Sequence, residues 1–300
     1  MVKPSYEELF QSGKLEQIAS QLENKARECT LCPRRCGVDR SMKKDGNCRS
    51  GLLPIVSSWS AHFGEEPPLV GRRGSGTIFF TNCNMACIFC QNYDISHLGY
   101  GNEVSYRDLA LMMISLKEKG CHNINFVTPT HMVHAIVKAL LIAVPLGLDI
   151  PLVYNSGGYD SVGTLRMLDG VFDIYMPDLK YSDNGIAHTL SGVNNYSDTA
   201  RGAVREMHRQ VGDLRIDGTG IAYRGLLVRH LVLPDERAGT TEVVDFLCGL
   251  SRHTYLNIMD QYRPVYKARE CPEICRRVTL KEIDDAVGYA RKRGMTRVIF

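Results

Sequence analysis

Three cysteines in the segment TNCNMACIFCQNY (81–93) are the residues of this chain whose type and spacing best suit chemistry. Cys83, Cys87 and Cys90 are separated by three and then two residues and follow an apolar run. Thiolates bind iron through sulfur, and four of them would close every corner of a four-iron cluster. Three ligands leave one metal position open, and an open position is where metal sites perform catalysis. The alternatives are a zinc knuckle or three buried thiols.

A second group of cysteines lies near the amino terminus, in a C-x2-C-x3-C-x11-C pattern formed by Cys29, Cys32, Cys36 and Cys48. Four thiolates this close in sequence suit a closed tetrahedral site. Few apolar residues surround them, so we expect a bound metal to fold the segment. Zinc and a second iron–sulfur cluster both match the pattern, and reduced thiols in a solvated loop are the alternative. Four ligands leave no open position, which predicts a structural or electron-relay role.

The sequence favours a reducing compartment, in which these thiols would not form disulfides. The amino terminus lacks a basic segment followed by an apolar run, and the most apolar stretch, ALLIAVPLGL at 139–148, is too short to span a bilayer. We therefore expect a cytoplasmic protein with no membrane partner, whose clustered cysteines bind metals or catalyse rather than form disulfides. The net charge of +3 gives no clear indication of a nucleic-acid partner. Cys271 and Cys275 fit either a redox pair or an incidental spacing.

Six short apolar runs, separated by helical patterns, are the elements that must position the cysteines. The runs are GTIFF (76–80), NINFVT (123–128), PLVYNS (151–156), IYMPDL (174–179), LLVRHLVLP (226–234) and YLNIMD (255–260). The helical patterns cover 105–119, 130–146, 161–169, 197–212, 240–252 and 279–293, and RVIF at the end is a candidate short strand. Strands that alternate with helices imply parallel pairing with right-handed crossovers.

The predicted fold class is α/β: a partial (β/α)6 TIM-like barrel with a cysteine-rich N-terminal extension. The barrel is expected over residues 76–300. The extension, residues 1–75, is expected to contain a helix at 5–28 and an irregular segment at 29–75, which is rich in Cys, Gly, Arg and Pro. His131 and His134, one helical turn apart, are expected on a solvated helix face rather than as metal ligands.

Polar residues cluster at the carboxyl ends of the predicted strands, where α/β folds place their chemistry. They are Asn82, Thr128, Thr130, Asn155, Ser156, Asp178, Lys180, Asp260 and Gln261. Two of these assignments have a structural alternative. Asp178 and Lys180 lie two residues apart and would also fit a surface ion pair. His230, within an apolar run, fits a hydrogen-bonded core histidine as well as a ligand.

The C-x3-C-x2-C spacing, with Phe89 before the last cysteine, resembles the signature of the radical S-adenosylmethionine (SAM) superfamily. The flanking segments resemble the pyruvate formate-lyase activating-enzyme-like branch. They are GSGTIFFTNC, CIFCQNYDIS, DLK (178–180), RHLVLP (229–234) and MDQYRP (259–264). The segment CPRRCGVDR resembles uncharacterised members of that branch, and the resemblance extends over nearly the whole chain.

This resemblance implies that Cys83, Cys87 and Cys90 hold a [4Fe–4S] cluster whose fourth iron binds SAM. One electron from the reduced cluster would cleave the sulfonium to methionine and a 5′-deoxyadenosyl radical, which abstracts hydrogen from the substrate. Contacts to SAM are expected from Asn155, Ser156, Asp178, Lys180 and His230. The chain reads VTPTH where many members carry Gly-Gly-Glu. Thr128 and Thr130 are the residues there that can accept hydrogen bonds from the methionine ammonium.

The expected substrate is a protein or peptide, and a glycyl-radical enzyme is one such target. The expected electron source is a low-potential donor such as flavodoxin or ferredoxin. Two alternatives remain open from the residues alone. The same radical chemistry can act on a small metabolite, or both cysteine groups can belong to a non-catalytic metal-binding or redox-sensing protein.

Overall fold

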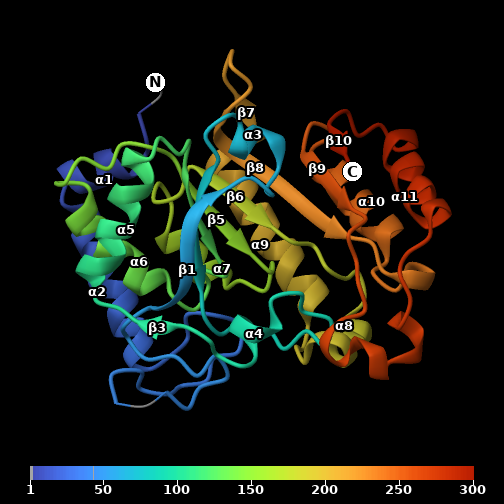
Figure 1. Cartoon of the computed structure of the whole chain (residues 1–300), viewed down its shortest axis with the longest axis horizontal. Coiled ribbons are helices and arrows are strands. Elements are labelled where there is room, and N and C mark those ends of the chain that lie inside the picture. The colour runs from blue at the N-terminus through green and yellow to red at the C-terminus, as the bar shows by residue number, and fades with distance from the viewer. Residues whose placement is uncertain (1–2, 43) are drawn as a thin grey trace.

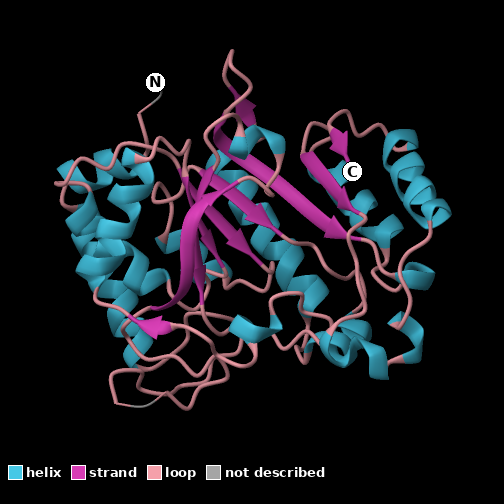
Figure 2. Cartoon of the chain, viewed as in Figure 1, coloured by secondary structure: helices cyan, strands magenta, loops and turns pink. Residues whose placement is uncertain are grey.

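The computed structural model describes residues 3–42 and 44–300 and has one central sheet with helices around it (Figures 1 and 2). The strand order is β10-β9-β8-β6-β5-β4-β2-β1-β3, and β7 pairs with β8 off this path. The strands are β1 (Ile55–His62), β2 (Ser75–Phe80), β3 (Asn102–Glu103), β4 (Ile124–Val127), β5 (Leu152–Ser156), β6 (Ile174–Pro177), β7 (Arg215–Ile216), β8 (Ala222–Leu231), β9 (Tyr255–Met259) and β10 (Val298–Ile299).

The six predicted strands form the parallel part of the sheet. They correspond to β2, β4, β5, β6, β8 and β9, which pair in parallel in the order in which they occur along the chain. RVIF supplies β10, parallel to β9. The prediction of a partial, TIM-like barrel is therefore confirmed, and the described strands leave the sheet open between β3 and β10. This topology brings the carboxyl ends of six strands to one mouth.

The helices also follow the predicted alternation. They are α1 (Tyr6–Gln11), α2 (Lys14–Arg27), α3 (Pro67–Val70), α4 (Tyr93–Ser96), α5 (Tyr106–Glu118), α6 (Val133–Ala143), α7 (Val162–Met167), α8 (Asn184–Ser191), α9 (Tyr196–Val211), α10 (Thr240–Leu250) and α11 (Leu280–Lys292). The single helix predicted at 5–28 is instead two, because Gly13 adopts a left-handed φ of 72° between them. Short 3-10 turns lie at Pro234–Glu236, Tyr266–Glu270 and Pro272–Ile274.

The prediction of an irregular segment over 29–75 is wrong for residues 55–62. These form β1, which pairs antiparallel with β2 from Val56–Phe80 to His62–Ser75. The strand escaped prediction because one face is partly exposed and carries polar residues, unlike the continuous apolar runs of the parallel strands. Within 29–42 and 44–54 the chain forms turns and loops, as expected. The division of the chain at residue 75 stays a prediction.

The core lies between the sheet and its covering helices. Phe126, Tyr154 and Phe172 are fully buried, and the Phe172 ring meets each of the other two edge-on. Helix α6 contacts both α2 and α5, so most of its surface is buried. None of the helices in the described ranges has the length and hydropathy needed to cross a bilayer.

Candidate functional site

The three-cysteine loop (residues 81–92) runs from the end of β2 to α4. Asn82, its second residue, has a φ of 68° and turns the chain sharply away from the strand. Two backbone hydrogen bonds fix it to the end of α8: Ala86 N–H donates to Ser191 O, and Ile88 N–H donates to Leu190 O, both at 2.9 Å. The loop is therefore held in shape by the protein itself.

Phe89 provides a second anchor for the three-cysteine loop. Its ring is 4% exposed and meets Tyr181 and Tyr262 edge-on, with ring centroids 6.3 and 5.8 Å away. Edge-to-face contacts of this kind stabilise by about 0.5–1.5 kcal/mol beyond the burial of area. The aromatic residue inside the cysteine motif thus orients the loop.

The thiols of Cys83, Cys87 and Cys90 are partly buried, and each has a hydrogen-bonding neighbour. Met85 N–H donates to Cys83 Sγ at 3.3 Å, and the Ser191 hydroxyl donates to Cys87 Sγ at 2.9 Å. The Ser96 hydroxyl lies 3.1 Å from Cys90 Sγ. Burial raises the pKa of the Cys83 and Cys87 thiols, and the charge of Lys180 opposes this rise. A bound cation would hold all three as thiolates.

Three thiols in one loop make a donor set that fits an iron–sulfur cluster. Among the described residues, no three His, Cys, Asp or Glu side chains are placed to share one metal ion. In a cluster each thiolate binds a different iron, so the sulfurs need not converge on one point. Residues 81–92 contain no fourth side chain of these types. The loop could hold three irons of a [4Fe–4S] cluster and leave the fourth to an exchangeable ligand.

A buried charged network lies at the ends of β5, β6 and β8. Asp178 accepts hydrogen bonds from Lys180 Nζ at 2.6 Å and Arg229 Nε at 2.9 Å. Arg229 also donates to Asn155 Oδ1 at 2.7 Å and pairs with Glu65 at 3.3 Å. The side chains of Asp178 and Lys180 are only 13% and 17% exposed, so the surface-pair alternative is wrong. Burial alone would raise the pKa of Asp178, but the charges of Arg229 and Lys180 lower it.

Lys180 connects this network with the three-cysteine loop. Burial alone would lower its pKa, but Asp178 and then Cys87 raise it above the ordinary value. A Cβ on Gly157 would lie 2.8 Å from Met85 Sδ and 3.6 Å from Lys180 Cε, so the backbone after β5 passes close to both side chains. The loop and the strand ends therefore meet closely, and the SAM contacts predicted for Asn155, Asp178 and Lys180 stay predictions.

Ser156 and Thr130 bind a carboxylate that the sequence reasoning missed. The buried Asp160 accepts hydrogen bonds from Thr130 Oγ1 at 2.7 Å, Tyr154 Oη at 2.8 Å and Ser156 Oγ at 2.6 Å. Burial raises its pKa, and these three hydroxyls oppose the rise. The hydroxyl hydrogens of Thr130 and Ser156 are thus already used within the fold. Thr128, with a φ of 59°, ends β4 in a left-handed turn.

His230 lies inside the sheet rather than open to the mouth. It is 1% exposed, and its ring nitrogens lie 2.6 Å from Leu179 O and 2.9 Å from Thr240 Oγ1. Burial lowers its pKa to about 4, so the ring is neutral. Both nitrogens have protein partners, which is the environment of a hydrogen-bonded core histidine. A contact of this residue with SAM stays a prediction.

The expectation of a solvated face for His131 and His134 is wrong. Both side chains are buried, and each places Nε2 2.9 Å from a backbone carbonyl, that of Thr81 for His131 and that of Leu52 for His134. The reason is that α6 is apolar on nearly all sides and lies between other helices. The two histidines fix the segments that precede β1 and the three-cysteine loop.

Sequence reasoning missed Arg229, Glu65 and Asp160. Of the three, Arg229 could most readily be identified from the sequence, because a charged residue inside an apolar strand indicates a buried partner of opposite charge. Glu65 had no comparable signal, since it lies in the segment that was expected to be irregular. Asp160 lies only four residues after Ser156, one of the polar residues expected at the strand ends.

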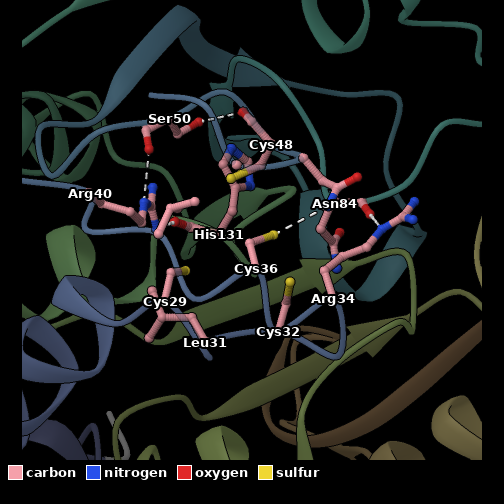
Figure 3. A pocket seen from close by; sticks show the side chains of 13 residues that line it. Cys29, Leu31, Cys32, Arg34, Cys36, Arg40, Cys48, Ser50, Asn84 and His131 are labelled. Atoms are coloured by element: carbon pink, nitrogen blue, oxygen red, sulfur yellow. Dashed lines mark hydrogen bonds between the residues drawn. The ribbon is translucent and has the colours of Figure 1, made fainter. Parts of the chain in front are cut away.

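Near the amino terminus, Cys29, Cys32, Cys36 and Cys48 line one cavity, here called the four-cysteine site (Figure 3). Cys29, Cys32 and Cys48 are buried and Cys36 is partly buried. Burial raises the pKa of the Cys32 thiol to about 12. Asn84, from the three-cysteine loop, lines the same cavity, so the two cysteine groups are neighbours. Figure 1 shows the blue N-terminal loops at the same end of the molecule as α4.

Comparison with known proteins adds one relative and two solved structures. No protein-family model matches the sequence. The uncharacterized protein MJ0674 of Methanocaldococcus jannaschii is 35% identical over 279 residues, which are 90% of this chain and 76% of that protein. HydG, a maturase of the [FeFe]-hydrogenase, matches with a TM-score of 0.53 and 13% identity over 75% of this chain. Methylornithine synthase (PylB) matches with a TM-score of 0.46 and 14% identity, over 75% of this chain and 70% of PylB.

These matches differ in what they establish. The match to HydG covers 51% of that protein, so this chain spans about half its length, and it supports a shared fold. That fold is a TIM-barrel-like sheet, which here is open. The match to MJ0674 is close enough, and covers enough of both chains, to show common ancestry. The chain therefore belongs to the same family as the uncharacterized protein MJ0674 of Methanocaldococcus jannaschii, on a fold similar to that of HydG.

Proposed function

We propose that this chain is a radical SAM enzyme that abstracts hydrogen from a protein or peptide substrate. One observation carries the proposal: three cysteine thiols, with no fourth ligand in their loop, lie at the end of β2 beside the buried network of Asp178, Lys180 and Arg229. When bound, a [4Fe–4S] cluster with SAM would supply reductive cleavage of the sulfonium and a 5′-deoxyadenosyl radical.

The chain's own residues would bind and orient these groups. Cys83, Cys87 and Cys90 would each hold one iron. Lys180, positive and close to Cys87, would offset the negative charge of the thiolates. The Asp178 carboxylate, kept ionised by Arg229, would accept a hydrogen bond from the amino group or the ribose of SAM. Phe89, Tyr181 and Tyr262 would keep water away from the reacting carbon.

The proposed substrate class follows from the open sheet. An incomplete barrel leaves one side of the mouth accessible between β3 and β10, which suits a loop of a macromolecule better than a sealed cavity would. A glycyl-radical enzyme is the target that the sequence resemblance favours, which would make this chain an activase. A low-potential flavodoxin or ferredoxin in the cytoplasm is the proposed electron donor.

Anaerobic reconstitution with iron and sulfide tests the chemistry. We expect a cluster whose paramagnetic resonance spectrum changes when SAM is added, and 5′-deoxyadenosine when a reductant is present. A combined Cys83→Ala, Cys87→Ala and Cys90→Ala variant is the control and should yield no nucleoside. Zinc in place of iron, with no nucleoside, would overturn the proposal and favour a non-catalytic metal protein.

The substrate class needs a separate measurement. Nucleoside formation should increase when the protein fraction of a cell extract is added, with deuterium passing from labelled protein to the nucleoside. Stimulation by the small-molecule filtrate instead would mean that the same chemistry acts on a metabolite.

A further inference from the structure

We propose that the four-cysteine site holds a second iron–sulfur cluster, which passes electrons to the cluster at the three-cysteine loop. The inference rests on the proposed function, because the three-cysteine loop must receive an electron for SAM cleavage. It assigns a chemical identity and a role to the N-terminal cysteines.

The four thiols surround a single space. All four cysteines line the same cavity, together with Arg34, Arg40, Asn84 and His131 (Figure 3). The backbone folds back on itself there: Cys29 N–H donates to Val38 O and Gly37 N–H donates to Cys29 O, both at 3.0 Å. Gly37, with a φ of 68°, allows this reversal. Asn47 Nδ2 donates to Cys36 Sγ at 3.3 Å, a hydrogen bond of the kind that tunes iron–sulfur clusters.

The arrangement of the thiols favours iron and sulfide over zinc. A structural zinc site needs four ligands on one ion at about 2.3 Å. Within 3–42 and 44–300, however, no group of three or more such side chains is placed to hold one ion. Thiols that share a cavity without converging on one point match a cluster, in which each thiolate has its own iron.

A buried cation beside the thiols supports a negatively charged occupant. Arg40 is 3% exposed; its Nε donates to Ser50 O at 2.9 Å and its Nη1 to His131 O at 2.6 Å. Its Nη2 is buried with no hydrogen-bond partner among the described residues. His131, which is 1% exposed, likewise leaves Nδ1 without a partner. A cluster bound by four thiolates carries net negative charge, which the unpaired guanidinium nitrogen would stabilise.

A short connection joins the two sites. Arg34, two residues after Cys32, donates from Nε to Asn84 O at 2.9 Å, and Asn84 directly follows Cys83. Figure 3 shows this bond at the rim of the cavity. A route from Cys32 to Cys83 therefore needs only covalent bonds and one hydrogen bond.

The proposed electron transfer balances one electron at a time. A reduced flavodoxin-type or ferredoxin-type donor would lose one electron to a cluster held by Cys29, Cys32, Cys36 and Cys48. That electron would then pass to a cluster held by Cys83, Cys87 and Cys90, so that the first cluster returns to its oxidised state. No bond forms or breaks at the N-terminal cluster, since all its irons are already coordinated.

Metal analysis of the full-length variant Cys83→Ala, Cys87→Ala and Cys90→Ala tests the first half of the inference. We expect this variant to bind iron and sulfide at the four-cysteine site after reconstitution, with a Mössbauer spectrum of an iron–sulfur cluster. Zinc, or no metal at all, would overturn the proposal. This result is independent of SAM cleavage, so it separates failure of the N-terminal cluster from failure of the proposed function.

Reduction kinetics test the second half. In a Cys32→Ala and Cys48→Ala double variant, reduction of the remaining cluster by reduced flavodoxin should slow by at least about tenfold, while reduction by dithionite changes by less than about twofold. The control replaces Cys271 and Cys275, which lie outside both groups. If the double variant does not fold, Arg34→Ala keeps all ligands and should slow the same step, with Arg35→Ala as its control. Equal rates with flavodoxin in wild type and Arg34→Ala would overturn the relay.

Discussion

The two cysteine groups are neighbours in space but are held in opposite ways. The three-cysteine loop is anchored by the protein: hydrogen bonds to Leu190 and Ser191, and Phe89 packed between two tyrosines. The four-cysteine site lies in turns and loops without a helix or strand. The three-cysteine loop is therefore preformed and contains only three cysteine ligands, whereas the four-cysteine site contains four and has no regular secondary structure to hold it. A site built for catalysis is rigid and open; a site built for structure or relay is closed.

Among the substitutions proposed here, Cys87→Ala should have the largest effect, which is a loss of activity at the three-cysteine loop. Loss of one of three ligands should lower the rate of 5′-deoxyadenosine formation by about 1,000-fold or more, equivalent to about 4 kcal/mol. Iron bound at the four-cysteine site should remain. The buried Cys121→Ala variant is the matched control, since Cys121 belongs to neither group. Retention of full activity by Cys87→Ala would mean that the cluster lies elsewhere.

Arg229→Gln tests the rigidity of the mouth. It removes the cation that Asp178 and Glu65 share and leaves Asp178 with Lys180 alone. Loss of one partner of a buried ion pair typically costs about 3–5 kcal/mol. Denaturant unfolding of the metal-free protein measures the loss. Arg237→Gln, which breaks the exposed pair with Glu273, should cost about 1 kcal/mol or less. Equal effects of the two substitutions would show that the network does not stabilise the fold.

Removal of metal should separate the two regions directly. With a chelator present, proteolysis within residues 29–54 should accelerate by about tenfold, because the segment has little apolar core of its own. Cleavage within 81–96 should change little, since protein contacts fix that loop. Mass spectrometry of the fragments over time measures both rates. Faster cleavage within 81–96 than within 29–54 would mean that the three-cysteine loop, and not the N-terminal segment, depends on bound metal for its structure.

Acid titration should give the smallest effect and compare one histidine from each region. Burial lowers the pKa of His131, beside the four-cysteine site, and of His230, below the mouth, to about 4 from 6.5. Between pH 6.5 and 4 the unfolded chain binds more protons, so the free energy of unfolding falls as pH falls. Each histidine contributes up to about 1.4 kcal/mol per pH unit. Thermal melts of His131→Asn and His230→Asn should show a shallower pH dependence than wild type; an unchanged slope would mean that the histidine is charged in the fold.

The parallel sheet was predictable because buried parallel strands are continuous apolar runs, such as NINFVT and PLVYNS. The three-cysteine motif was predictable from spacing alone. β1 was not, since Ser58 and Ser60 interrupt its apolar pattern and its partner β2 lies beyond an intervening turn. The partners of Arg229 also escaped prediction, because Glu65 and Asp178 meet it only in three dimensions. Local sequence patterns therefore predict helices and strands, whereas ion pairs between residues far apart in the sequence can be identified only from the folded structure.

The pairing of β1 with β2 has a consequence for the stability of the segment that leads into the three-cysteine loop. Without β1, the strand that precedes the three-cysteine loop would be the edge of the sheet, where backbone amides open to water most readily. β2 instead lies between β1 and β4. Fraying that begins at the edge strand β3 must therefore open β1 before it reaches Phe80 in β2. Spontaneous opening at that margin is thereby kept away from the three-cysteine loop that follows Phe80.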